Sequence, residues 1–312
     1  MTEKAISLLQ ELSEAHAVPG HEDEVRAIFV DELSACGDLD TDRLGSVTCD
    51  LGGQGPKVMV AGHMDEVGFM VQEITAEGFL RFVTLGGWWA HNLLSQRVEV
   101  LTRDGRKILG VISSQPPHFL PESKRREVMS IEQMFIDIGA DSRKQACNEF
   151  GIAVGDPIAP VAAFTQMSQK HLYMAKAFDN RVGMAGVIQC GHSLNTLERP
   201  NRILLCGTVQ EEMGLRGAKT AASRWEPDVA IILEGPPADD IPGYNRAQCQ
   251  GRLGGGVQIR FFDPSAIAHP RLARLAVETA EMENIPHQVT VRRSGGTDAG
   301  SFHLAKHGIP CV

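Results

Sequence analysis

The stretch Val58–Met70, Val-Met-Val-Ala-Gly-His-Met-Asp-Glu-Val-Gly-Phe-Met, decides how the rest of this 312-residue sequence is interpreted. It starts with a short apolar run, which is typical of a buried strand. Because side chains two residues apart in a strand point to the same face, His63 and Asp65 share a face where the strand ends. A carboxylate often orients a metal-binding imidazole, but buried His–Asp pairs are also common in protein cores. The pair therefore indicates either a metal site or a core pair.

The composition is that of an ordinary globular protein. Apolar residues make up 43 % of the sequence and charged residues 22 %, and the chain is long enough for a full core. The formal net charge of −9 argues against a nucleic-acid partner, because such proteins present a basic face. No apolar stretch reaches the length that crosses a membrane, so we also expect no membrane partner.

The cysteines and the start of the sequence favour a cytoplasmic protein. The seven cysteines include no Cys-x-x-Cys pair, and their odd number is typical of reduced intracellular thiols. The first residues, Met-Thr-Glu-Lys-Ala-Ile, lack the basic start and long apolar run of a signal peptide. We therefore expect a cytoplasmic location.

The periodicity of apolar residues divides the sequence into three parts. Helical periodicity in Ala5–His16 and again from about Glu22 indicates an α/β domain, and the same texture returns from Leu172. Between Phe69 and about Ala163 the pattern is one of short strands and turns, which predicts a small β-barrel-like domain. The expected organisation is α/β, with residues 1–67 and 165–312 forming the catalytic domain and residues 68–164 inserted in it.

Acidic or metal-binding side chains follow four predicted strands. They are His63 after the first strand, Asp179 after Leu172–Ala177, Glu211 and Glu212 after Arg202–Val209, and Glu234 after Val229–Leu233. If the strands are parallel neighbours, these side chains meet at one edge of the sheet, where ligands collect in α/β folds. Several acids so close together repel one another, and one or two divalent cations would offset that charge. One histidine with carboxylates suits zinc, cobalt or manganese, although acids at strand ends also cap helices.

The consecutive pair Glu211-Glu212 has a further meaning. Neighbouring side chains in an extended chain point to opposite sides. One of the two carboxylates can therefore bind a metal while the other faces the substrate as a base.

At this point four segments together resemble a known family. The sequence is similar to the glutamyl (deblocking) aminopeptidases, which are dinuclear metallopeptidases that form tetrahedral particles and have sometimes been named endoglucanase or cellulase. The resemblance covers nearly the whole chain and rests on Gly62–Gly68, Ala177–Arg181, Gln210–Ala218 and Gly295–Gly300. It implies a zinc-peptidase-like mixed sheet with helices on both faces, and it places the Gly295–Gly300 turn near the active site, whereas the residues alone also allow a plain helix cap.

The resemblance assigns two divalent metal ions to each subunit, with zinc, cobalt or manganese as candidates. His63 and Glu234 would bind the first metal, and Glu212 the second. Asp179 would bridge the two. The family usually has aspartate where this sequence has Glu234, so the carboxylate is kept on a longer arm.

The family's last metal ligand is a histidine that follows a further strand. Ile309–Val312 resembles the beginning of that strand, and the sequence stops there. We therefore expect the second metal to lack one protein ligand in this chain, as in a truncated sequence.

The resemblance also implies an activity and an assembly. Asp65 would orient the His63 side of the site, and Glu211 would be the general base. The expected enzyme is a metal-dependent aminopeptidase that releases N-terminal residues from peptides through a water held between the two metals. The inserted domain would mediate dimers within a homo-oligomer, with a tetrahedral dodecamer as the expectation. The alternatives are a related dinuclear amide hydrolase or deacylase, and a non-catalytic assembly subunit.

Overall fold

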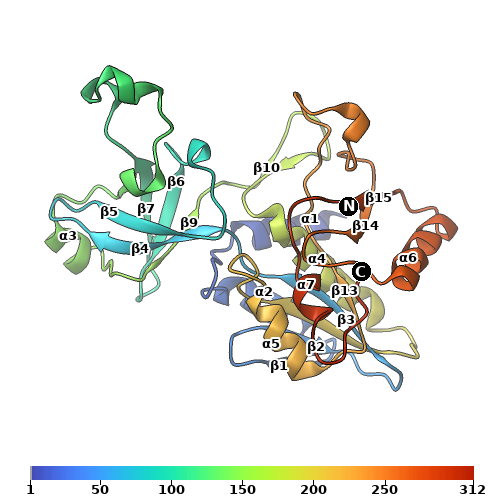
Figure 1. Ribbon diagram of the computed structural model, residues 1–312. Helices are drawn as coiled ribbons and strands as arrows, with labels where there is room; N and C mark the ends of the chain where they lie inside the picture. Colours follow the sequence, from blue (N-terminus) through green and yellow to red (C-terminus); the bar gives the residue numbers. More distant parts are fainter. Residues whose placement is uncertain (1) are drawn as a thin grey trace. The chain divides into compact units, whose positions relative to one another are not determined.

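The structure, a computed structural model, describes residues 2–312 and contains two compact units (Figure 1). The sheet unit comprises the chain up to Leu12, Val25–Met64 and Phe178–Val312. The barrel unit comprises Ser13–Glu24 and Asp65–Ala177. It therefore includes a segment near the N-terminus that the sequence-based division assigned to the catalytic domain.

The sheet unit is built on a five-stranded mixed sheet with the order β1-β2-β12-β3-β13. β3 is parallel to both β12 and β13, whereas β2 is antiparallel to β1 and β12. At the edge of the sheet, Cys311 pairs in parallel with Ala230 of β13. The strands are β1 (Asp38–Thr41), β2 (Val47–Asp50), β3 (Lys57–His63), β12 (Arg202–Thr208) and β13 (Val229–Ile232).

Helices cover both faces of this sheet. On one face, Met59 and Ala61 of β3 share an apolar core with Ala218 of α5 and Phe302 of α7. On the other face α4 lies so close that a Cβ added to Gly191 would be 2.7 Å from the Leu205 side chain. The helices are α1 (Glu3–Glu14), α2 (Asp23–Leu33), α3 (Arg143–Asn148), α4 (Phe178–Leu194), α5 (Arg216–Trp225), α6 (Pro270–Met282) and α7 (Ala299–Phe302).

Outside this sheet, α6 packs on a separate parallel pair of strands, β14 (Val257–Phe262) and β15 (His287–Val291). Short 3-10 turns complete the chain at η1 (Ala90–Asn92), η2 (Pro117–Phe119), η3 (Glu122–Arg126), η4 (Ile131–Gln133) and η5 (Arg246–Gln248). Among the described residues, each helix is too short or too polar to span a membrane.

The barrel unit contains a closed barrel with the strand order β4-β5-β8-β7-β6-β9. Its apolar interior includes Phe69, whose ring stacks on Trp88 at a centroid distance of 4.7 Å. The barrel strands are β4 (Gly68–Ile74), β5 (Leu80–Leu85), β6 (Arg97–Leu101), β7 (Lys107–Ser113), β8 (Phe135–Asp137) and β9 (Pro157–Pro160). The predicted fold class, an α/β protein with an inserted β-barrel-like domain, is confirmed.

One predicted strand is wrong in a way that matters for the site. The sequence predicted a strand of the α/β domain over Leu172–Ala177, but the structure has only β11 (Tyr173–Met174), which pairs with β10 (Thr165–Gln166) in a separate two-stranded sheet. Beyond β11, Ala177 has a left-handed conformation with φ 56°, so the chain is not extended up to Asp179. Asp179 therefore does not follow a strand of the main sheet.

Candidate metal centre and active site

His63 ends β3 and faces two carboxylates. Its Nε2 atom lies 3.1 Å from Oδ1 of Asp179 and 3.1 Å from Oε1 of Glu234. Among residues 2–312, these three side chains form the group whose ligand atoms all lie within 4.8 Å of one another. A ring nitrogen carries at most one proton, so it cannot satisfy two carboxylates equally. A cation between the three side chains would satisfy all of them.

Glu211 is the fourth member of this cluster. Its Oε2 atom lies 4.0 Å from His63 Nε2, and its side chain is only 11 % exposed. Burial raises the pKa of Glu211 to about 9, against the pull of His63, and the charges of Asp298, Glu234 and Glu212 add to the effect. Burial likewise raises the pKa of Glu234. Without a cation, both carboxyl groups therefore tend to hold protons.

The donor set fits a divalent metal ion. Oε2 of Glu234 is buried and has no hydrogen-bond partner among residues 2–312, and buried polar atoms are rarely left in this state. Zinc binds histidine nitrogen and carboxylate oxygen, and imidazole also suits other transition metals. A metal ion would supply the missing partner and the positive charge together.

Asn180 explains how Asp179 reaches the cluster without a preceding strand of the main sheet. The buried Asn180 side chain donates a hydrogen bond to the Leu233 carbonyl at 2.8 Å and accepts one from the Gly183 amide at 3.0 Å. Glycine is required at position 183, because a Cβ there would lie 2.4 Å from the Leu233 oxygen. The start of α4 is thus tied to the end of β13, one residue before Glu234.

Arg181 makes the matching attachment to β3. Its guanidinium is fully buried and donates to the carbonyl oxygens of Leu12, at 2.9 Å, and of Met64, the residue after His63. Asn180 and Arg181 therefore fix Asp179 to the chain just after β13 and just after β3. These are the two places where Glu234 and His63 lie. The sequence analysis included Asn180 and Arg181 only within the Ala177–Arg181 segment and gave neither a role, although both are polar residues followed by a largely apolar stretch of helix.

The structure thus brings together His63, Asp179, Glu211 and Glu234 from the predicted set. Glu212 follows Glu211 and is half-buried, and Asp65 is fully buried at the start of the longer barrel-unit segment. The roles assigned to all six residues remain predictions.

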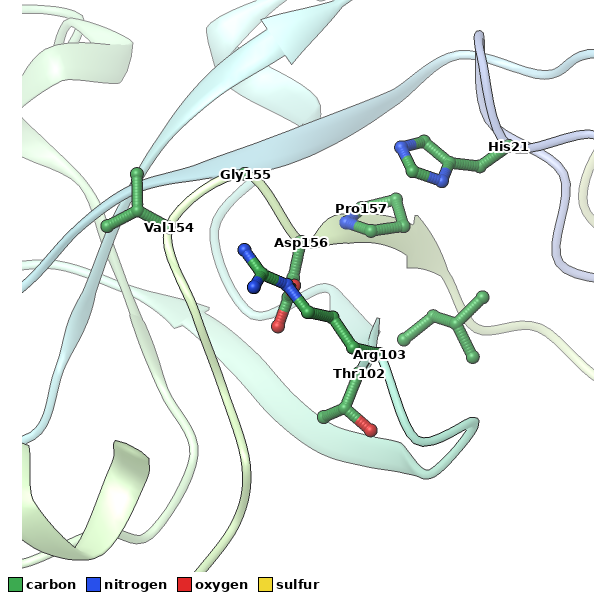
Figure 2. Close-up of a pocket in the computed structure, with 8 residues that line it drawn as sticks. His21, Thr102, Arg103, Val154, Gly155, Asp156 and Pro157 are labelled. Atoms are coloured by element: carbon green, nitrogen blue, oxygen red, sulfur yellow. The ribbon is translucent and has the colours of Figure 1, made fainter. Parts of the chain in front are cut away.

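A second feature of interest is a pocket of about 220 Å³ in the barrel unit (Figure 2). It is lined in part by His21, Arg103 and Asp156. The Asp156 side chain accepts a hydrogen bond from the Ala153 amide at 2.8 Å, and it lies 4.0 Å from Nε of Arg103. Asp156 therefore closes the turn before β9, and its charge already has a partner within the barrel unit.

Comparisons with known proteins give a consistent result. The family model for the M42 glutamyl aminopeptidases matches residues 45–312. The FrvX protein of Escherichia coli, whose name describes an aminopeptidase, is 41 % identical over 98 % of this chain and 85 % of that protein.

Two solved structures extend the comparison. The TET aminopeptidase of a marine-sediment Thaumarchaeota archaeon has a TM-score of 0.95 and 40 % identity, covering 99 % of this chain and 87 % of that one. The TET1 peptidase of Pyrococcus horikoshii, described as assembling into a tetrahedron or a large octahedral shell, has a TM-score of 0.85 and 29 % identity, covering 98 % and 89 %.

The fold and these similarities define a peptidase, an enzyme of the hydrolase class. More particularly, the chain belongs to the M42 glutamyl aminopeptidase family. The resemblance that the four sequence segments indicated is thereby confirmed.

Proposed function

We propose that the chain is a metal-dependent aminopeptidase that removes N-terminal residues from peptides, with Glu211 as the general base. The observation that carries the proposal is the cluster in which the His63 imidazole meets the Asp179 and Glu234 carboxylates at 3.1 Å, with Glu211 beside them. Membership of an aminopeptidase family supports the same reaction.

His63 and Glu234 would hold the first of two divalent metal ions, Glu212 the second, and Asp179 both. Zinc, cobalt and manganese all suit this set of ligands. When bound, such ions lower the pKa of water and stabilise negative charge on a carbonyl oxygen. Asp65 would keep the His63 ring in one orientation, as carboxylates commonly do beside metal-binding imidazoles.

Glu211 moves the proton in this proposal. Its carboxylate takes a proton from the attacking water and gives it to the leaving amine, so that it ends the cycle unchanged. Asp179, with a side chain that is 59 % exposed, is the part of the cluster most open to solvent. The free α-amine of a substrate would lie there, near one metal ion and the carboxylates, which would account for action at N-termini.

Metal removal tests the proposal. Chelation should abolish hydrolysis of aminoacyl-anilides, and added zinc, cobalt or manganese should restore it. Free peptides should be cleaved, whereas N-acetylated peptides should not. Hydrolysis that survives complete metal removal contradicts the proposal.

The same experiment separates the alternatives. A preference for N-acetylated substrates would favour a deacylase or related amide hydrolase. A metal content near zero per chain, with no activity, would favour a non-catalytic assembly subunit.

We further propose that the chain forms a homo-oligomer through the barrel unit, with a tetrahedral dodecamer as the expected form. Leu109, Phe119 and Val128 are large apolar side chains of this unit that are exposed in the single chain, which suits an interface. Light scattering on the purified protein would measure the mass of the particle.

The cytoplasmic location expected from the cysteines also remains a proposal.

A further inference from the structure

Asp298, in the turn that opens α7, has a side chain that the proposed reaction does not use. It occupies the N-cap position, yet its side chain makes no capping hydrogen bond. The carboxylate is instead fully buried and accepts a hydrogen bond from Oγ1 of Thr208. Capping of α7 by its side chain therefore does not account for an acidic residue here.

Thr208 is the last residue of β12, where it pairs with His63 of β3. The loop that follows it, residues 209–215, carries Glu211 and Glu212 before α5 begins. At the far end of this loop, Oγ of Ser301 donates a hydrogen bond to the Leu215 carbonyl at 3.0 Å. One short segment, from Asp298 to Ser301, therefore holds the loop at both ends.

The loop needs such support because its backbone is unfavourable. Gln210 and Leu215 have left-handed conformations with φ values of 53° and 57°. For residues with a Cβ this costs on the order of 1 kcal/mol each, and it persists only where the surroundings impose it. The two residues flank the segment that carries Glu211, so relaxation of either one would move its carboxylate.

The turn is itself firmly anchored. The Thr297 amide donates to Oγ of Ser265 at 3.1 Å, and that hydroxyl donates to Asp263 at 2.6 Å. A Cβ added to Gly300 would lie 2.7 Å from Cβ of Ser265. The Asp298–Ser301 segment is thus a fixed point to which the loop is attached.

We propose that Asp298 and Ser301 form a bracket that holds the 209–215 loop so that the Glu211 carboxylate faces the His63 cluster. Asp298 is then a positioning residue, acting through Thr208. The role in turnover rests on the proposed function of Glu211, whereas the bracket itself does not. Because the bracket positions the base, its loss should lower kcat and leave KM nearly unchanged.

Four variants test the bracket. Asp298→Asn keeps an oxygen that can accept the Thr208 hydroxyl, whereas Asp298→Ala removes it, and Thr208→Val removes the donor. Thr290→Val is the matched control, because Thr290 is equally buried but its hydroxyl has no hydrogen-bond partner among residues 2–312.

We expect Asp298→Ala and Thr208→Val each to lower kcat by about 10- to 100-fold, since a misplacement near 1 Å can cost that much. KM should stay within about twofold and bound metal should be unchanged. Asp298→Asn should keep most of the activity, and Thr290→Val all of it. Hydrogen exchange of the 209–215 amides should quicken in Asp298→Ala and Thr208→Val, but not in Asp298→Asn or Thr290→Val.

The bracket is wrong if Asp298→Ala keeps wild-type kcat and exchange, or if Asp298→Asn loses as much as Asp298→Ala, which would indicate a role for the charge. If Asp298→Ala does not fold, Thr208→Val and Ser301→Ala decide the question. Should the wild-type enzyme prove inactive, the proposed function fails, but the exchange measurement still tests the bracket.

Discussion

Two groups of charged side chains in this molecule are balanced in different ways. In the barrel unit the Lys176 ammonium contacts the Glu66 carboxylate, with side chains only 7 % and 3 % exposed, and Lys176 also donates to the Ala15 carbonyl at 2.7 Å. In the sheet unit, the carboxylates of Asp179, Glu211 and Glu234 gather around one imidazole.

The difference shows which charges the protein balances with its own side chains. Lys176 gives Glu66 a full counter-charge, so that pair is complete without a ligand. Near the sheet-unit cluster, Arg181 donates to carbonyl oxygens, and the charge of Arg260 lowers the pKa of Glu234 without offsetting the effect of burial. The acids must then be neutralised by protons or by a metal ion, and the raised pKa values of Glu211 and Glu234 report that demand.

The largest expected effect comes from removing the base in the unbalanced cluster. Glu211→Gln should lower kcat by about 10³-fold, within the range for loss of a general base, because the amide cannot accept the proton. The variant should still bind metal, which elemental analysis of the purified protein would measure. A fully active variant would rule out Glu211 as the base.

The next largest effect comes from breaking the balanced pair. Lys176→Met removes the ammonium that contacts the buried Glu66 carboxylate and should lower the free energy of unfolding by about 3 kcal/mol. Urea unfolding of the metal-free protein would measure this. The double variant Lys176→Met/Glu66→Leu should recover most of the loss, and equal losses in the single and double variants would contradict the ion-pair interpretation.

The unbalanced cluster should also set the pH dependence of the metal-free protein. The folded pKa of Glu211, about 9, lies above its usual 4.5, so the folded state keeps a proton that the unfolded chain loses. Its stabilising contribution is complete below pH 4.5 and is lost as the pH rises towards 9, with a slope on the order of 1 kcal/mol per pH unit. Glu211→Gln should flatten this slope in urea unfolding at a series of pH values, and an unchanged slope would exclude Glu211 as its source.

The smallest effect is expected for an exposed ion pair, which serves as the reference for the buried Lys176–Glu66 pair. Lys124 and Glu127 lie 2.8 Å apart, but their side chains are 59 % and 56 % exposed. Lys124→Met should change the free energy of unfolding by less than about 0.5 kcal/mol, because solvent screens the pair. A loss comparable with that of Lys176→Met would show that burial is not what distinguishes the two.

The sequence predicted three of the four cluster members by the correct route. β3, β12 and β13 are short apolar runs, and their parallel pairing brings His63 to the same sheet edge as the segments that carry Glu211 and Glu234. Asp179 was placed correctly in the cluster but by the wrong route. Its position depends on hydrogen bonds from Asn180 and Arg181 to residues distant in sequence, which no local pattern contains.

The barrel shows the same limit of prediction from local sequence patterns. The pattern of short strands and turns between Phe69 and about Ala163 predicted a barrel correctly, because hairpins such as β6–β7 are joined by short connections. β9 is not evident from local sequence, since Pro157 and Pro160 at its ends argue against a strand. Ile158 of β9 pairs with Phe69 of β4 on one side and with Val100 of β6 on the other, and this pairing closes the barrel.

Because several carboxyl groups surround His63, binding of metal ions to this cluster should release protons into the medium. Carboxyl groups that retain protons in the empty cluster must give them up when an ion takes their place. The apparent affinity for the ion should then climb with pH, and the availability of metal and the acidity of the medium would jointly set how much of the protein is active.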